Sequence, residues 1–135
     1  MKKRILLIDK DGNKNPETYL LKEGYEVDAL CFLKTGLYKL FEQKIKYDLI
    51  VIEIMLSYEG LFSKEESSDG LLSGICFFKK YLKDLQVPVL FWTWNHDFKE
   101  NVLILKEENP ESKIGFAGRT MQHEDLVDTV NNFLK

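Results

Sequence analysis

Three polar side chains stand where apolar, β-branched stretches of this chain end. Asp9, Glu53 and Thr93 each close such a stretch, and the one before Glu53 is the most apolar. A charge at the end of a buried strand costs free energy unless it is paired or lies at the carboxyl edge of the sheet. Open α/β sheets bind their ligands at that edge. We therefore expect the three side chains to line one crevice.

Further charged side chains flank the expected crevice. Lys10 and Asp11 follow Asp9 directly, and a turn containing Arg119 follows the last apolar stretch. If the strands are parallel, these residues meet at the same edge of the sheet. Glu53 and Lys10 would then form a partly buried ion pair, which could simply hold two loops together, just as Thr93 could simply end its strand.

The elements that must position these side chains alternate along the chain. Spacing and turn residues predict five strands, at 4–9, 25–31, 47–55, 87–93 and 113–117. The helical spacing predicts five helices, at about 15–24, 33–45, 74–85, 98–105 and 126–134, the first with Asn15 as its N-cap and Pro16 as its first residue. Such alternation indicates an α/β fold with a doubly wound parallel sheet. The stretch 25–31 alternates like an edge strand, which favours the flavodoxin-like strand order 2-1-3-4-5.

Length and composition limit the function classes. The 135 residues, 44% hydrophobic and 30% charged, suit one domain over 1–135. The polar segment 57–73 is long for a loop, and we expect it to be flexible and dispensable for folding. The net charge of −3 is spread over interspersed residues, which argues against nucleic-acid binding.

Cysteine usage and the amino terminus suggest a cytoplasmic protein. Cys31 and Cys76 lie in apolar patterns without a second thiol at metal-ligand spacing, so we expect them to be buried and reduced. The apolar stretch after the first four residues is too short for a signal peptide or a membrane-spanning helix.

These residues resemble those of response-regulator receiver domains, the CheY-like signalling domains of two-component systems and phosphorelays. Asp9 matches the family's first acidic position, Thr93 its hydroxyl position and Phe116 its aromatic switch position. The pattern at 74–82 resembles the family's third helix. The resemblance covers nearly the whole chain apart from residues 61–73.

Three positions depart from the family pattern. Lys10 replaces an acidic magnesium ligand, Glu53 replaces the phosphoacceptor aspartate, and Arg119 stands where a lysine is usual. The family site has a surplus of negative charge that magnesium neutralises. Here the cations bring the cluster near neutrality, and the extra methylene of Glu53 displaces its oxygen from the position for in-line attack. We therefore expect a degenerate pseudo-receiver with no catalytic residue, no cofactor and no bound magnesium.

Two other interpretations remain open. The stretch 5–12, ending in Asp-x-Asp-Gly, also resembles the first motif of haloacid-dehalogenase-type phosphatases, with Asp9 as nucleophile and Asp11 as acid/base. Against this magnesium-dependent enzyme, no later strand ends in paired aspartates. The second alternative is a flavodoxin-like interaction module with no signalling role.

The partner surface is expected on the fourth helix. Helical spacing directs Phe98, Val102 and Leu105 to the core and Leu103 and Ile104 to solvent. The resemblance implies contact through the fourth helix, the fifth strand and the fifth helix. A stand-alone receiver-like protein would use this surface to form a homodimer or to bind a histidine kinase or a downstream effector, and we expect neither nucleic acid nor membrane as a partner. Trp92 and Trp94 are expected to be packing residues, although Trp94, next to Thr93, could instead fill the phosphate pocket.

Overall fold

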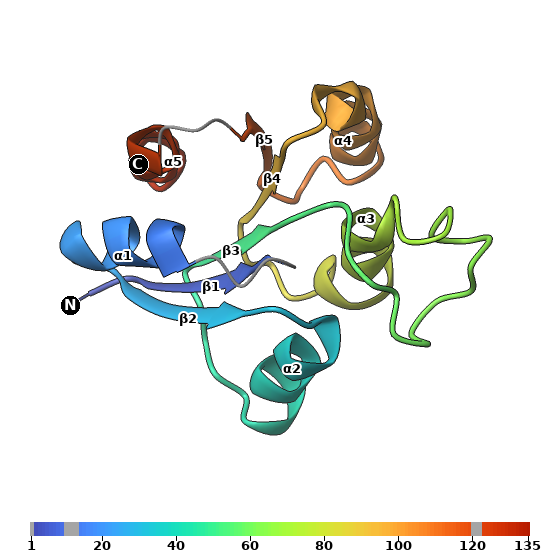
Figure 1. Ribbon diagram of the computed structural model, residues 1–135, viewed down its shortest axis with the longest axis horizontal. Coiled ribbons are helices and arrows are strands. Elements are labelled where there is room, and N and C mark those ends of the chain that lie inside the picture. Colours follow the sequence, from blue (N-terminus) through green and yellow to red (C-terminus); the bar gives the residue numbers. More distant parts are fainter. Residues whose placement is uncertain (1, 10–13, 120–122) are drawn as a thin grey trace.

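Five parallel strands form the sheet, in the order β2-β1-β3-β4-β5 (Figure 1). The structure is a computed structural model and describes residues 2–9, 14–119 and 123–135. The strands are β1 (Arg4–Ile8), β2 (Glu26–Leu30), β3 (Leu49–Ile52), β4 (Val89–Thr93) and β5 (Ile114–Gly118). The order confirms the flavodoxin-like, doubly wound fold predicted from the alternation of strands and helices.

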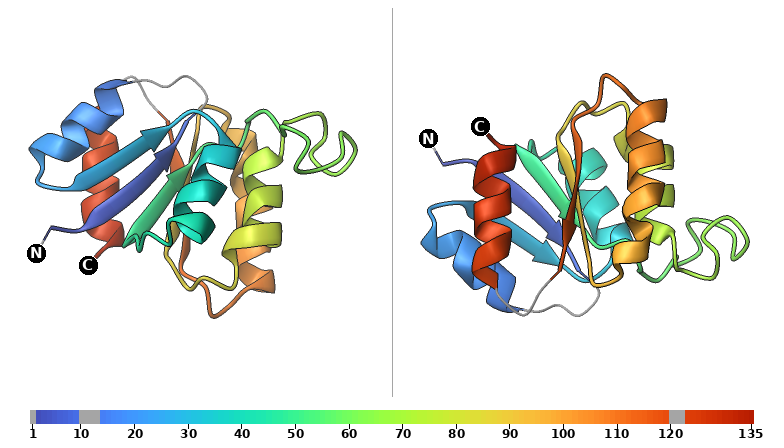
Figure 2. Two further views of the ribbon diagram at one scale, coloured as in Figure 1. Left: turned by 90° about the horizontal axis from the view of Figure 1, so that it is seen from below. Right: turned by 90° about the horizontal axis from the view of Figure 1, so that it is seen from above.

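Helices cover both faces of this sheet. They are α1 (Lys14–Lys22), α2 (Leu33–Leu37), η1 (Tyr38–Glu42), α3 (Ser73–Phe77), η2 (Phe78–Leu82), η3 (His96–Phe98), α4 (Lys99–Glu108) and α5 (His123–Phe133). Helices α1 and α5 lie on one face, and α2, α3 and α4 lie on the other (Figure 2). In the part of the chain that the structure describes, no helix combines the length and apolarity needed to cross a bilayer.

The core has one layer on each side of the sheet. In β1, Ile5 and Leu7 pack toward α1 and α5, whereas Leu6 and Ile8 pack toward α2 and α3. This is the alternation of side chains along a strand. All residues of β3 and β4 are buried, while β2 is exposed or half-buried, as an edge strand must be. The expected edge and central strands are thus confirmed.

Two local expectations were wrong. Helix α1 begins at Lys14, so Asn15 and Pro16 lie in its first turn and Asn15 is not the N-cap. Cys31 and Cys76 are free thiols, but both are half-buried. Cys31 directly follows the edge strand, and Cys76 lies under the neighbouring loop, where its thiol contacts the Glu66 carbonyl at 3.2 Å.

The second and third helices each widen in their second half. The Gln43 amide donates to the Tyr38 carbonyl at 2.8 Å and the Lys83 amide to the Phe78 carbonyl at 3.0 Å, both from residue i+5 to residue i. Such bonds define π turns, which shift the side chains that follow away from ordinary helical spacing. Phe41, which that spacing would place in the core, is 41% exposed.

The segment 57–73 packs more closely than its composition suggests. Phe62 is buried in the core layer beneath α3, and Ser67 is fully buried. Ser63 and Glu66 cap each other's backbone amides, at 3.0 and 2.9 Å. Flexibility of the segment stays a prediction, but the buried phenylalanine argues against the expectation that the whole segment is dispensable.

Candidate functional site

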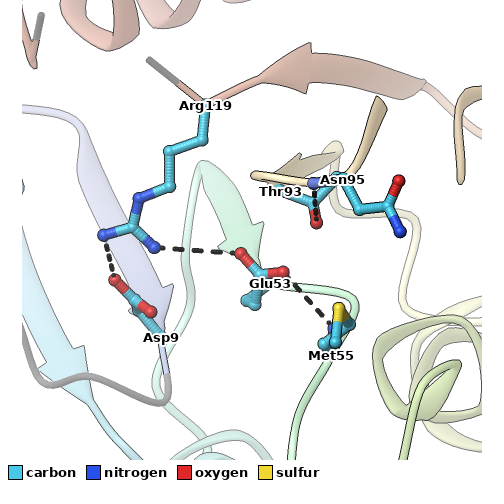
Figure 3. Close-up of polar contacts among 6 residues, drawn as sticks. All are labelled: Asp9, Glu53, Met55, Thr93, Asn95 and Arg119. Atoms are coloured by element: carbon cyan, nitrogen blue, oxygen red, sulfur yellow. Dashed lines mark hydrogen bonds and ion pairs between the residues drawn. The ribbon is translucent and has the colours of Figure 1, made fainter. Parts of the chain in front are cut away.

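A buried cluster of Asp9, Glu53 and Arg119 lies at the carboxyl edge of the sheet (Figure 3). The Arg119 guanidinium forms an ion pair with the Asp9 carboxylate at 2.8 Å and faces the Glu53 carboxylate at 3.8 Å. All three residues are 3% exposed. The structure thus brings together side chains that are 44 and 66 positions apart, as the parallel strand order predicts.

Backbone hydrogen bonds extend the sheet by one residue at each of these positions. The Asp9 amide donates to the Leu30 carbonyl at 2.9 Å, and the Glu53 amide donates to the Ile8 carbonyl at 3.0 Å. The Arg119 amide donates to the Thr93 carbonyl at 2.7 Å. Asp9 and Glu53 are therefore held at the ends of the neighbouring inner strands β1 and β3, and Arg119 is held at the end of the edge strand β5 by its bond to β4.

The Glu53 carboxylate is held by neighbouring groups. The Met55 amide donates to its Oε1 at 3.4 Å, and the neighbouring Thr93 side chain also lowers the pKa of this carboxyl group. Burial raises the pKa of Glu53 above its usual range, although these two groups and Arg119 act in the opposite direction. Desolvation is the largest effect, so Glu53 gains a proton more readily than an exposed glutamate.

Two tryptophans cover the guanidinium of Arg119. The centre of the guanidinium lies 4.0 Å from the Trp92 ring and 5.1 Å from the Trp94 ring. A planar guanidinium is stabilised over an aromatic face, and more strongly when water is excluded. Trp92 is buried, as expected of a packing residue, whereas Trp94 is 47% exposed and closes the cluster toward solvent.

Sequence reasoning treated Trp92 as a packing residue and missed its contact with Arg119. The signal was available, because residues 92 and 94 project to the same side of a strand. Thr93 pairs with Gly118 across β4 and β5, so Arg119 follows directly beside that pair. Met55 was also missed, and its contribution is a backbone amide that no side-chain pattern reveals.

The close approach of α3 to β3 fixes the loop beside the site. A Cβ on Gly74 would lie 2.4 Å from the Glu53 carbonyl oxygen and 2.9 Å from the Ile54 Cα. The Gly74 amide donates to the Ile54 carbonyl at 2.9 Å. Glycine is needed here because the backbones touch.

The predicted switch and partner residues lie apart from the cluster. Phe116 in β5 is half-buried and makes an edge-on ring contact with His96, with the ring centres 6.4 Å apart. Leu103 and Ile104 on α4 are 46% and 49% exposed, as helical spacing predicts. Lys10 and Asp11 lie outside the described residues, and so does the expected ion pair of Lys10 with Glu53.

The described residues hold little surplus negative charge at this site. Two carboxylates and one guanidinium leave a net charge of −1, or zero when Glu53 is protonated. Over residues 2–9, 14–119 and 123–135, no group of three or more His, Cys, Asp or Glu side chains is arranged to hold a metal ion.

Comparison with solved structures places this fold among response-regulator receivers. A two-component response regulator from Clostridium difficile is 25% identical, with a TM-score of 0.71 and coverage of 98% of this chain and 96% of that one. A CheY-like receiver domain protein from Methanospirillum hungatei is 18% identical, with a TM-score of 0.71 and coverage of 99% and 94%. The Thermotoga maritima regulator TrrA, solved in complex with Mg²⁺-BeF, is 21% identical, with a TM-score of 0.65 and coverage of 97% and 98%.

No family model matches the sequence, and no curated protein matches it. The chain has the CheY-like fold of response-regulator receiver domains. The alternative of a haloacid-dehalogenase-like phosphatase is not supported, since the similar structures are receivers.

Proposed function

We propose that this chain is a receiver-like signalling domain that acts through protein–protein contact and independently of phosphorylation. Its similarity to receiver structures over nearly the whole chain supports the signalling role. The single observation that supports independence from phosphate is the buried ion pair of Arg119 with Asp9, beside Glu53.

The first reason to expect independence from phosphorylation is the charge of the site. Phosphoryl transfer depends on electrostatic stabilisation of the transferred group, for which magnesium is the usual source. Magnesium prefers several hard oxygen ligands that together carry negative charge. Here the Asp9 carboxylate is already bound to a guanidinium at 2.8 Å, and Glu53 is easily protonated. A divalent cation would have to compete with a cation that the chain itself provides.

The second reason to expect independence from phosphorylation is the geometry of the Glu53 carboxylate. Glu53 is one methylene longer than aspartate, and its two oxygens face the Met55 amide at 3.4 Å and Arg119 at 3.8 Å. An attacking oxygen must be aligned with the phosphorus and the leaving group. A carboxylate held by an amide and a guanidinium would have to break both contacts to reach that alignment.

The proposed contact surface lies on α4 and β5. Leu103 and Ile104 are adjacent exposed aliphatic residues, and exposed apolar residues that form a patch mark protein contacts. They line a hollow with His96 and Glu100, near the ring contact of His96 with Phe116. We propose that this surface mediates homodimer formation or binds a histidine kinase or a downstream effector.

Incubation with acetyl phosphate and magnesium tests the proposal. We expect no phosphoryl adduct by intact mass, because Arg119 pairs with Asp9 and faces Glu53, which occupies both carboxylates and opposes binding of magnesium. A receiver that phosphorylates under the same conditions serves as the positive control in the same reaction. A phosphoryl adduct on Glu53 or Asp9 would contradict the proposal.

A further inference from the structure

A second surface is formed by α2–η1 and α3–η2 together with the segments that lead into β3 and β4. The segments α2–η1 and α3–η2 lie side by side on one face of the sheet (Figure 2). They present aromatic rings to solvent, with Tyr38 55% and Phe41 41% exposed. The Phe41 ring centre lies 6.5 Å from that of Tyr81, which in turn contacts Phe77 at 5.3 Å. Exposed aromatic residues are therefore continuous with the core here.

The aromatic residues of this surface lie in the two π turns. Tyr38 and Phe41 lie in η1, and Tyr81 lies in η2. Single π turns within α-helices occur frequently at functional sites. Both neighbouring helices carry such a turn at the same surface.

Two hollows lie on either side of Phe41. The first, of about 500 Å³, is lined by Lys34, Leu37, Tyr38, Phe41, Glu42 and Tyr81. The second, of about 530 Å³, has Leu40, Ile45, Tyr47, Leu85 and Val87 in its lining, together with Phe41, Lys44 and Lys46. Hollows of this size with mainly apolar linings are typical of sites that accept large side chains.

The rim of this surface is strongly basic. Residues 33–47 and 73–86 contain seven lysines and two acidic residues, a net charge of +5, although the whole chain carries −3. Lys34, Lys44 and Lys46 line the hollows, and the Lys80 ammonium lies 5.5 Å from the Tyr81 ring centre. Three lysines and one acidic residue, Glu42, line the two hollows, so their linings carry a net charge of +2.

We infer that this surface, called here the α2–α3 surface, binds an acidic amphipathic helix of a partner protein. Two large apolar side chains on one face of that helix would fill the two hollows, and its glutamates or aspartates would face the lysines. Grooves that accept amphipathic helices have this combination of apolar pockets and complementary charge at the rim.

An anionic membrane carries negative charge, as an acidic helix does, but its shape does not match this surface. Side chains that insert into a bilayer must protrude, as Tyr38 and Phe41 do, but a lipid layer offers no side chain to fill a hollow. Here Leu37, Ile45 and Leu85 are half-buried inside the hollows. The concave apolar lining therefore favours a partner protein whose side chains enter the hollows. It does not favour a lipid layer, which side chains of this chain would have to enter.

This inference does not depend on the proposed function. The α2–α3 surface is formed by residues on the α2 and α3 face, whereas the contact surface proposed above lies on α4 and β5. Loss of binding at one surface should leave the other intact.

The full chain can be tested with a defined probe. The probe is a fluorescent 18-residue helical peptide with leucine and phenylalanine on one face and glutamate elsewhere. The control peptide has the same composition in an order that spreads its apolar residues around the helix. We expect anisotropy to show saturable binding of the first peptide and at least about tenfold weaker binding of the second, with affinity falling as salt is added.

Paired substitutions locate the site. Phe41→Ala with Lys46→Glu should weaken binding of the probe at least about tenfold. The matched control is Leu21→Ala with Lys22→Glu on α1, which likewise removes one exposed large apolar side chain and reverses one exposed lysine, and which should bind like the original chain. Equal binding by both double variants would overturn the inference.

Two further measurements remain decisive if the first double variant does not fold. Amide chemical shifts of the unmodified chain should change with the probe at 34–47 and 76–87, and changes centred on α4 and β5 would overturn the inference. Anionic phosphatidylserine vesicles should compete poorly with the probe. Binding to the vesicles without binding to the peptide would show that the surface is a membrane contact.

Discussion

At the scale of single residues, Arg119 is the side chain on which the candidate site depends. It contacts both carboxylates and both tryptophans of the cluster, and it is almost fully buried. A buried charge that loses its partner is costly because neither water nor another group replaces the lost interaction. Arg119 therefore offsets the free-energy cost of burying the Asp9 and Glu53 carboxylates.

Replacing this arginine should destabilise the fold. For Arg119→Met we expect a loss of about 3 kcal/mol in the free energy of unfolding, measured by chemical denaturation, because Asp9 is left charged and buried. Adding Asp9→Asn and Glu53→Gln should restore much of that loss. Arg4→Met is the control, since Arg4 pairs with Asp28 at 3.0 Å but its side chain is 38% exposed, so we expect a loss of about 1 kcal/mol or less. Equal losses for the two arginines would show that the cluster is not electrostatically coupled.

The raised pKa of Glu53 predicts a pH dependence. A carboxyl group whose pKa is higher in the folded than in the unfolded state binds its proton more tightly when folded. Its stabilising contribution is complete below the usual value of 4.5 and is lost as the pH rises through the folded-state pKa. The free energy of unfolding of the original chain relative to Glu53→Gln should therefore fall as the pH rises above about 4.5.

Glu66 serves as a control because its pKa is shifted in the opposite direction to that of Glu53. The Ser63 amide donates to the Glu66 carboxylate at 3.0 Å, and the amide and side chain of Ser63 lower the pKa of this exposed glutamate. Its contribution is therefore present above the unfolded-state pKa and is lost as the pH falls. Chemical denaturation at several pH values gives the free energy of unfolding of the original chain relative to each variant. Relative to Glu66→Gln this difference should rise with pH, whereas relative to Glu53→Gln it should fall. A difference that does not change with pH for Glu53→Gln would contradict the raised pKa of Glu53.

At the scale of elements, the segment 57–73 combines polar surface with one core residue. Phe62 is 7% exposed, packs with the core layer and lies beneath the Lys80 ammonium, 5.9 Å from its ring centre. Lys80 also donates to the Leu61 carbonyl at 2.9 Å. The segment is thus attached to α3–η2 through two neighbouring residues.

Phe62→Ala tests whether this attachment contributes to folding. We expect a loss of about 3 kcal/mol in the free energy of unfolding, because removing a buried ring leaves a cavity. Leu71→Ala in the same segment is the control, since Leu71 is 46% exposed and should change stability by no more than about 0.5 kcal/mol. A Phe62 variant as stable as the Leu71 variant would show that the segment is dispensable, as its composition suggests.

At the scale of the whole molecule, the two faces of the sheet leave different surfaces for contact. The double substitution Leu103→Lys with Ile104→Asp should weaken self-association or partner binding and change stability by no more than about 1 kcal/mol, because both side chains are exposed. Sedimentation velocity and thermal denaturation measure the two effects. Leu21→Lys on α1, where Leu21 is 48% exposed, is the control and should leave association unchanged. Unchanged association in the double variant would place the contact elsewhere.

Periodic patterns in the sequence were sufficient to predict the fold and the position of the site. Alternation in 25–31 and the apolar run at 49–52 separate an edge strand from a central one, because burial on one or both faces determines which residues a strand can carry. That distinction yields the strand order, and the strand order places Asp9, Glu53, Thr93 and Arg119 at one edge. The exposure of Leu103 and Ile104 follows equally from helical spacing.

Only the tertiary structure decided which side chains contact one another. The contact of Arg119 with Trp92 and Trp94 depends on side-chain directions at the ends of two adjacent strands, and the Met55 contribution comes from the backbone. The exposure of Phe41 and the burial of Phe62 depend on how α2, α3 and the segment 57–73 pack against the sheet. A sequence pattern records the average environment of a residue along its own element, whereas these features depend on contacts between elements.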